Sequence, residues 1–218
     1  MLFSGLPFLY YFLPAVLVCY FAAPRKLKNA VLFVFSLIFY GWGEPRYIML
    51  MIVSIVSGFV FALMIEKKQN KKSGLILMWI SVAISLSFLL VFKYADFLIE
   101  NVNQLPGVSL PLFKLSLPIG ISFYTFQIIS YTVDVWRGDT KAQRNIISFG
   151  TYVSLFPQLI AGPIVRYTDI ERELQERKHS VTLAASGIKR FLIGLSKKVL
   201  IANVLGELTD ICLKTSQP

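Results

Sequence analysis

The chain has 218 residues, of which 56% are hydrophobic and only 16% charged, and its mean hydropathy is +0.65. This composition excludes a disordered chain and an ordinary soluble domain, because lipid must be the solvent for much of such a sequence. The formal net charge of +10 does not indicate nucleic acid as a partner, since Lys and Arg stand in short clusters between apolar runs.

Six apolar runs predict an all-α fold, a polytopic integral membrane helical bundle in the lipid bilayer. A span needs roughly 20 apolar residues, so five of the runs are about long enough to cross and the second must cross obliquely or use interfacial aromatic residues. No Lys or Arg precedes Arg25, so we expect the first run to be a retained span and not a cleaved signal peptide. The runs cover residues 2–23, 30–43, 47–65, 75–92, 117–135 and 146–165.

The basic residues of the connecting loops predict the orientation of the chain. Loops one, three and five carry ten Lys and Arg residues, whereas loops two and four carry three. Basic loops stay on the cytoplasmic side, so we expect a multi-pass protein of the cell (inner, cytoplasmic) membrane with its N-terminus outside. Loop four contains an amphipathic piece, residues 94–105, that is expected to lie along the outer surface.

The sixth run is predicted to be a broken, re-entrant element. Pro157, Gly162 and Pro163 interrupt it, and a simple crossing would export the many basic residues that follow. A run that enters and returns to the cytoplasmic side avoids this, provided that its freed backbone groups are buried in protein or line a wet cavity. A proline kink stabilised by packing is the alternative.

The predicted organisation is a transmembrane bundle over residues 1–165, followed by a cytoplasmic-side charged segment and an amphipathic interfacial helix over residues 166–218. From Leu183 to Ala202, apolar residues recur at helical spacing while four basic residues lie off that stripe. Such a helix would bind the anionic leaflet. An ordinary span with basic ends is the alternative interpretation.

A polar seam follows the fifth run, which begins at Ser116 as N-cap with Pro118 in the first turn. At 100° per residue its five members fall within an arc of about 80° on one helix face. Polar groups in a membrane helix should face protein or water, either along a substrate path or as hydrogen-bonding contacts between helices. Asp134 is expected to pair with Arg137. The seam consists of Gly120, Tyr124, Gln127, Tyr131 and Asp134.

Next to this seam, the broken run carries Gln158 inside it and Arg166 at its exit. Irregular backbone beside a polar seam is one way in which membrane proteins build a substrate path. We therefore predict that Tyr124, Gln127, Tyr131, Gln158 and Arg166 line a tunnel or its entrance. His179 is the single histidine and has no second His or Cys nearby, so we predict neither catalysis nor a metal site there.

Several motifs together resemble the membrane-bound O-acyltransferase (MBOAT) family. LPIGISFYTFQIISYTVDVWRG (residues 117–138) and YVSLFPQLIAGPIVRY (152–167) carry most of the likeness, and FYGWGEPRY (39–47) and FLIGLSKKVLIAN (191–203) add to it. The resemblance covers nearly the whole chain. It is nearer to the alginate O-acetylation branch than to the D-alanyl transfer branch, because Val165 stands where the latter has an acidic residue.

The resemblance implies an MBOAT-like helical bundle around a tunnel, in which a histidine acts as general base while an acyl group passes to a hydroxyl. Relatives of this branch are more than twice as long and carry that histidine in their second half, and His179 lies outside their histidine motif. The chain is thus expected to be the N-terminal, incomplete part of the enzyme, to contain no catalytic residue and to be inactive alone. The implied donor is acetyl-CoA, with no bound cofactor.

The implied activity is O-acetylation of a cell-surface or exopolysaccharide such as alginate, together with an extracytoplasmic acetylation partner protein. D-alanyl transfer to teichoic acid remains an alternative within the family, separable by the proteins encoded beside it. A membrane transporter or scaffold without enzymatic activity is an alternative of another class, since a broken helix also suits a transporter.

Overall fold

The structure is a computed structural model that describes residues 3–69, 71–105, 109–114, 116–159, 162–177 and 179–215. Every regular element in these ranges is helical, which confirms the all-α prediction. The chain divides into two compact units. One runs from Val16 to Gln175, and the other joins residues 1–15 to residues 176–218.

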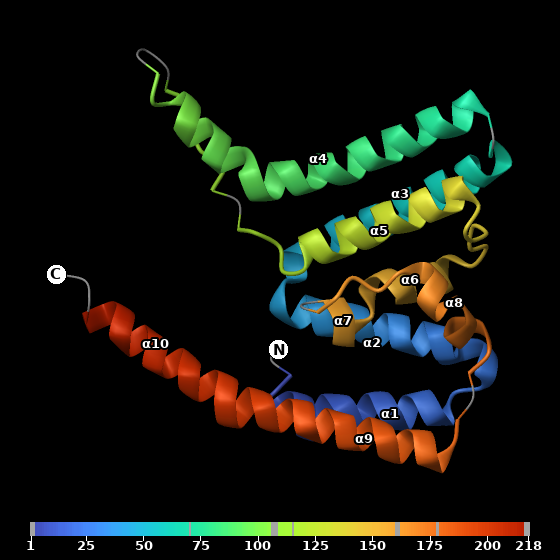
Figure 1. The fold of residues 1–218 in the computed structure, drawn as a ribbon, viewed down its shortest axis with the longest axis vertical. Helices are drawn as coiled ribbons and strands as arrows, with labels where there is room; N and C mark the ends of the chain where they lie inside the picture. Colours follow the sequence, from blue (N-terminus) through green and yellow to red (C-terminus); the bar gives the residue numbers. More distant parts are fainter. Residues whose placement is uncertain are drawn as a thin grey trace. The chain divides into compact units, whose positions relative to one another are not determined.

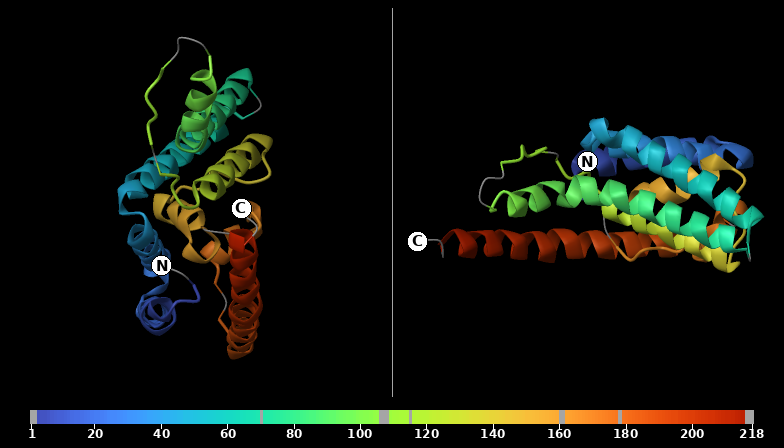
Figure 2. Two further views of the ribbon diagram at one scale, coloured as in Figure 1. Left: turned by 90° about the vertical axis from the view of Figure 1, so that its left-hand side faces the viewer. Right: turned by 90° about the horizontal axis from the view of Figure 1, so that it is seen from above.

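The unit from Val16 to Gln175 is a bundle whose main helices lie roughly side by side (Figures 1 and 2). Helix α3 packs against α4, α5 and α6, and α2 packs against α6. These elements are α2 (Lys28–Gly43), α3 (Ile48–Lys67), α4 (Lys72–Val102), α5 (Ile121–Arg137), α6 (Ile146–Ser154), α7 (Phe156–Leu159) and α8 (Tyr167–Gln175), with short 3₁₀ turns at Arg25–Leu27 and Pro45–Tyr47.

Within the described residues, two helices are long and apolar enough to cross a membrane: Pro45–Lys67 and Lys72–Val102. The expected amphipathic piece of loop four is not a separate element, because α4 continues through it to Val102. The first apolar run forms a π-helical turn, Phe8–Phe12, and helix α1, Leu13–Ala22. The other three predicted crossings, residues 2–23, 30–43 and 117–135, remain predictions.

Close approach of small residues sets the spacing of the bundle. A Cβ at Gly58 of α3 would lie 2.6 Å from Ile128 of α5, and one at Gly150 of α6 would lie 2.6 Å from the ring of Phe33 in α2. Small residues let helix backbones approach, which is the packing that helices use where lipid supplies no hydrophobic driving force.

The three basic loops gather at one end of the bundle. Asn29 after loop one donates to the Ser148 hydroxyl just beyond loop five at 2.9 Å, and Gln69 of loop three donates to the Val135 carbonyl just before loop five at 3.4 Å. At the opposite end Tyr47 donates to the Ser116 carbonyl at 2.8 Å, which joins loops two and four. The geometry agrees with the charge count, although the side of the membrane remains a prediction.

The second unit contains a long exposed helix, formed by α9 (Val181–Ser196), a π-helical segment (Lys197–Ala202) and α10 (Asn203–Thr215). Ser180 caps its start by accepting a hydrogen bond from the Leu183 amide at 3.1 Å. The predicted stripe assumed regular α-helical spacing, but the π segment puts an extra residue into a turn and so shifts the later positions. Interfacial binding of this helix remains a prediction.

Candidate functional site

The polar seam of α5 faces protein. Tyr124, Gln127, Tyr131 and Asp134 are all buried, whereas Phe126 on another face of the helix is exposed. Gly120 precedes α5 with φ of +77°, and a Cβ there would lie 2.6 Å from the Leu159 carbonyl oxygen. The seam therefore begins where the end of α7 touches it.

The sixth apolar run is broken, and its freed backbone groups find new partners. In an unbroken helix the amide of Phe156 would donate to the Tyr152 carbonyl. Instead it donates to the Ser36 hydroxyl of α2 at 3.3 Å, and the Gln158 side-chain amide donates to the Tyr152 carbonyl at 2.8 Å. Pro157 has no amide proton to lose. Side chains thus replace a backbone bond at the break.

Beyond α7 the chain returns toward the end at which it entered. Leu159 lies beside Gly120, before the first turn of α5, whereas Arg166 contacts Asp134 in the last turn. The two seam positions are separated by about 21 Å at 1.5 Å per residue. The path of the chain is therefore that of the predicted broken element, with Val165 held by a hydrogen bond of 3.0 Å from the Tyr152 hydroxyl to its carbonyl.

Asp134 pairs with Arg166, so the expected partner Arg137 was wrong. The Arg166 guanidinium contacts the two Asp134 carboxylate oxygens at 2.6 and 3.3 Å, and Asp139 lies 3.8 Å away. This hydrogen bonding raises the pKa of Arg166 above its usual range. Because two carboxylates balance the guanidinium, its first role in this structure is to tie the returning segment to α5.

Gln143 joins four segments at the same end of the bundle. Its backbone amide donates to the Tyr131 hydroxyl at 2.7 Å, its side-chain amide donates to the Tyr167 hydroxyl at 2.8 Å, and its side-chain oxygen accepts from the Asn145 amide. Burial raises the pKa of Tyr167 to about 12, so this phenol stays protonated at neutral pH. Sequence reasoning missed Gln143 and Tyr167, because a loop glutamine carries no signal of its partners.

The tyrosines of this network belong to an aromatic cluster made of Tyr131, Phe149, Tyr152 and Tyr167. Neighbouring ring centroids in the cluster lie between 4.7 and 6.4 Å apart. All four side chains are buried, and aromatic pairs at such distances add stability beyond the area that they bury. The cluster holds α5, α6 and α8 together.

Loop five is fixed to its neighbours by carboxylates that the sequence did not single out. Glu66 of α3 pairs with Arg144 and accepts from the Ala142 amide at 3.1 Å. Glu171 of α8 accepts from the Thr140 hydroxyl at 3.0 Å. These contacts hold loop five against α3 and α8.

Deeper along the seam, three buried polar atoms make no well-formed hydrogen bond among the described residues. They are the Tyr124 hydroxyl, the Gln127 side-chain oxygen and the hydroxyl of Tyr40 in α2. The Tyr40 and Tyr124 hydroxyls interact with each other, but not in good hydrogen-bond geometry. Buried polar atoms are nearly always paired, so these three indicate a place for water or a passing polar group.

The five predicted path residues thus fall into two groups. Gln158 and Arg166 make hydrogen bonds that fasten the broken run, and Tyr131 accepts one from Gln143 of loop five. Tyr124 and Gln127, in contrast, carry buried atoms without a well-formed hydrogen bond among the described residues. Tyr40 joins the second group and was missed, although it is a hydroxyl-bearing aromatic residue in the short second run. Whether these residues line a tunnel remains a prediction.

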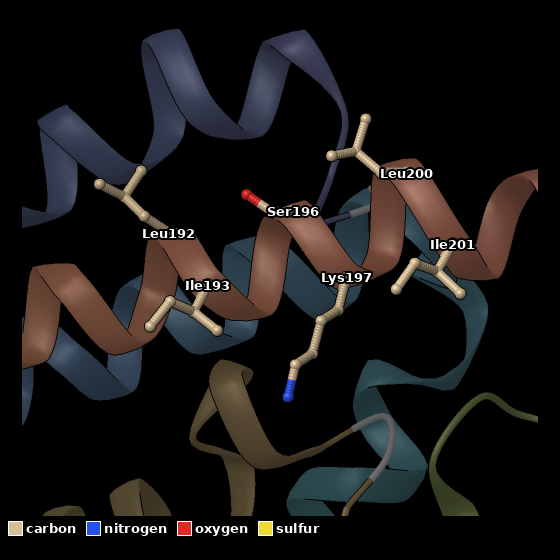
Figure 3. Close-up of a pocket in the computed structure, with 6 residues that line it drawn as sticks. All are labelled: Leu192, Ile193, Ser196, Lys197, Leu200 and Ile201. Atoms are coloured by element: carbon tan, nitrogen blue, oxygen red, sulfur yellow. The ribbon is translucent and has the colours of Figure 1, made fainter.

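Other parts of the described chain offer less chemistry. No three His, Cys, Asp or Glu side chains gather there as a metal would need. A shallow hollow of about 310 Å³ lies along the long exposed helix and is lined by one helical stretch alone (Figure 3). Its residues are Leu192, Ile193, Ser196, Lys197, Leu200 and Ile201.

Comparison with known proteins finds relatives over the whole chain. It is 38% identical to "Probable alginate O-acetylase AlgI" of Pseudomonas aeruginosa and 37% identical to the protein of that name in Azotobacter vinelandii, covering 43% and 45% of their lengths. A "Peptidoglycan O-acetyltransferase" of Helicobacter pylori is 28% identical over 96% of the chain and 46% of its own length. No family model and no solved structure matches. The chain spans less than half the length of these relatives.

Proposed function

Because the chain is homologous over its whole length to proteins named as alginate O-acetylases, we propose that it is the N-terminal part of a membrane O-acetyltransferase. The whole protein would transfer acetyl groups for O-acetylation of a cell-surface polysaccharide. Alginate is the first candidate acceptor, and peptidoglycan is the second because a relative carries that name. Acetyl is favoured over D-alanyl as the transferred group, since these relatives are named for acetylation.

The observation that carries this proposal is the buried polar seam beside the broken run. A helix that only fills a bundle gains nothing from burying unpaired oxygens, because each costs about 1–3 kcal/mol. Tyr40, Tyr124 and Gln127 bury three such atoms at one place. A path along which acetyl or an acceptor hydroxyl passes would give these atoms partners.

The proposed reaction attacks an acetyl thioester, for which acetyl-CoA is the proposed donor. The acceptor hydroxyl oxygen bonds to the carbonyl carbon, the carbon–sulfur bond breaks, and the hydroxyl proton passes to a base while the thiolate leaves. We place that base in the part of the relatives that this chain does not span, because His179 stands in a charged segment outside the family's histidine motif. The chain's own residues would bind and orient.

The test uses the full-length protein and two substitutions that keep side-chain volume, Tyr124→Phe and Gln127→Met. Each removes an unpaired atom, so neither should weaken folding. We expect the O-acetyl content of the polysaccharide to fall about tenfold, the effect of one lost hydrogen bond of about 1.4 kcal/mol in the transition state. Phe126→Leu, on the exposed face of α5, is the control and should acetylate normally.

Two further substitutions, Gln158→Ala and Arg166→Ala, test the broken run in the same assay. Both should abolish acetyl transfer while the protein still reaches the membrane, because each releases a contact that fixes the path. Normal acetylation in all four variants would show that seam and break are structural only.

The proposed setting is the cytoplasmic membrane, with donor entry from the end of the bundle that carries the basic loops and an acetylation partner protein on the outer side. Labelling of single cysteines by a membrane-impermeant maleimide would test it, in a chain with Cys19→Ser and Cys212→Ser. A cysteine at Lys68 should be protected in intact cells and one at Lys114 labelled. The reverse pattern would invert the orientation.

A further inference from the structure

A basic pocket lies at the end of the bundle where α4 begins and α5 ends. Its volume is about 470 Å³, and it is lined by Lys71, Lys72, Leu75, Trp136 and Arg137. Three cations and one indole therefore share a single hollow, and its lining contains no carboxylate. All five residues belong to the unit from Val16 to Gln175.

Three carboxylates at this end of the bundle are engaged by other arginines. Glu66 pairs with Arg144, and Asp134 and Asp139 both lie beside Arg166. Among the described residues no ion pair reaches Lys71, Lys72 or Arg137. The pocket therefore keeps its positive charge.

The backbone adds to this charge. Helix α4 has 31 residues, and among the described residues no side chain caps its start, so the amides of Lys72 and Ser73 remain open beside the pocket, while the Gly74 amide donates to the Lys71 carbonyl at 2.9 Å. Two of the last carbonyls of α5, those of Asp134 and Val135, are satisfied, because the Gly138 amide and the Gln69 side chain donate to them. The positive start of a long helix favours an anion.

We propose that this pocket binds the phosphate group of an anionic ligand, with the two lysines and Arg137 on the phosphate and Trp136 against its neighbouring groups. A lipid headgroup is the favoured source of the phosphate. Beyond Leu75, the exposed apolar side chains of Ile76, Trp79 and Ile80 continue along α4, where acyl chains would lie. A basic pocket between helices at the cytoplasmic side suits such a lipid.

Coenzyme A also carries phosphate groups and is the second candidate source. Of the two sources, it is the one that rests on the proposed function. The two sources separate in one binding experiment on the full-length protein, in which every tryptophan except Trp136 is replaced by Phe, Trp42→Phe and Trp79→Phe included. The protein is placed in phosphatidylcholine nanodiscs. One sample contains a trace of dibrominated phosphatidylglycerol, and a parallel sample contains a trace of dibrominated phosphatidylcholine. Bromine quenches Trp136 only where that lipid stays in contact. Coenzyme A is titrated in nanodiscs without brominated lipid.

The variant removes the pocket's cations while keeping polar side chains: Lys71→Gln, Lys72→Gln and Arg137→Gln. The matched control removes three exposed cations from loops at the same end of the bundle: Arg25→Gln, Lys26→Gln and Lys141→Gln. Both proteins lose the same charge, so they would respond alike to the general surface potential. Only the first should lose a specific site.

We expect phosphatidylglycerol to quench at concentrations at least about tenfold lower than phosphatidylcholine, and this preference to disappear in the pocket variant but not in the control. Saturable quenching by coenzyme A with the same dependence on the pocket cations would assign the phosphate to the nucleotide. An equal loss of binding in the pocket variant and the control variant would overturn the proposal. So would the absence of a preference for phosphatidylglycerol or coenzyme A over phosphatidylcholine. Because the readout is binding, loss of acetylation in the seam variants leaves the lipid result standing.

Discussion

The bundle from Val16 to Gln175 and the long helix from Val181 to Thr215 are both helical and both rich in apolar residues, yet their side chains meet opposite environments. In the bundle, side chains contact partners far away in the sequence, as the Asn29 side-chain amide and the Leu174 carbonyl do. Along the long helix, the described side chains are almost all exposed. Local signals suffice to form a helix, and only neighbours decide what each of its faces does.

The largest expected effect comes from removing one ring, that of Phe149, from the aromatic cluster. Phe149→Ala should lower the free energy of unfolding by about 3–5 kcal/mol, because Phe149 is fully buried against Tyr131 and Tyr152. Leu200→Ala in the exposed helix should change it by less than about 0.5 kcal/mol. Denaturant titration in detergent micelles measures both. Equal losses would mean that the long helix is packed as tightly as the bundle.

Breaking the ion pair should have the next largest effect. Arg166→Ala leaves the buried Asp134 carboxylate without its cation and should lower the free energy of unfolding, but by less than the loss of a fully buried pair, because Arg166 is half exposed. Replacing both residues, as Asp134→Leu with Arg166→Met, should cost less than Arg166→Ala alone. A double variant that loses more than the single one would contradict an electrostatic origin. Lys197→Ala in the long helix is the neutral control.

Glycine replacement sharpens the comparison further, because the two regions should respond with opposite signs. Gly120→Ala should destabilise by about 1–3 kcal/mol, since φ is +77° and its new Cβ would meet the Leu159 backbone. Gly187→Ala has open space around it and should stabilise α9 by about 0.5–1 kcal/mol. Thermal melts followed by circular dichroism provide the comparison. A destabilised Gly187→Ala would reveal a neighbour at that face.

Removal of a helix cap should show the smallest difference between the two regions, because a cap acts on its own helix in both. Asn145 caps α6 by accepting from the Ile147 and Ser148 amides, and Ser180 caps α9 by accepting from the Leu183 amide. Each substitution by Ala should cost about 1 kcal/mol of local helix stability. Hydrogen exchange of the first-turn amides measures it. An unequal response would show that packing against neighbours outweighs the cap.

The sequence predicted those features of the fold that depend on residue type and spacing. Helical periodicity placed Tyr124 and Gln127 on one buried face, and Pro157 marked the break. The pairing of Asp134 with Arg166 was out of reach, because the partners are 32 residues apart and the nearer Arg137 satisfied every local rule. Gln143 was missed for the same reason. The π-helical segment after Ser196 left no signal in the apolar pattern.

The exchange of partners at the broken run has a consequence for biogenesis. The Phe156 amide depends on Ser36, which precedes it by 120 positions, for its hydrogen bond. Because α2 is synthesised first, the Ser36 hydroxyl is already present when the ribosome delivers the later segment. Helix α2 therefore supplies the hydrogen-bond acceptor at the break, and it is synthesised before the segment that bends.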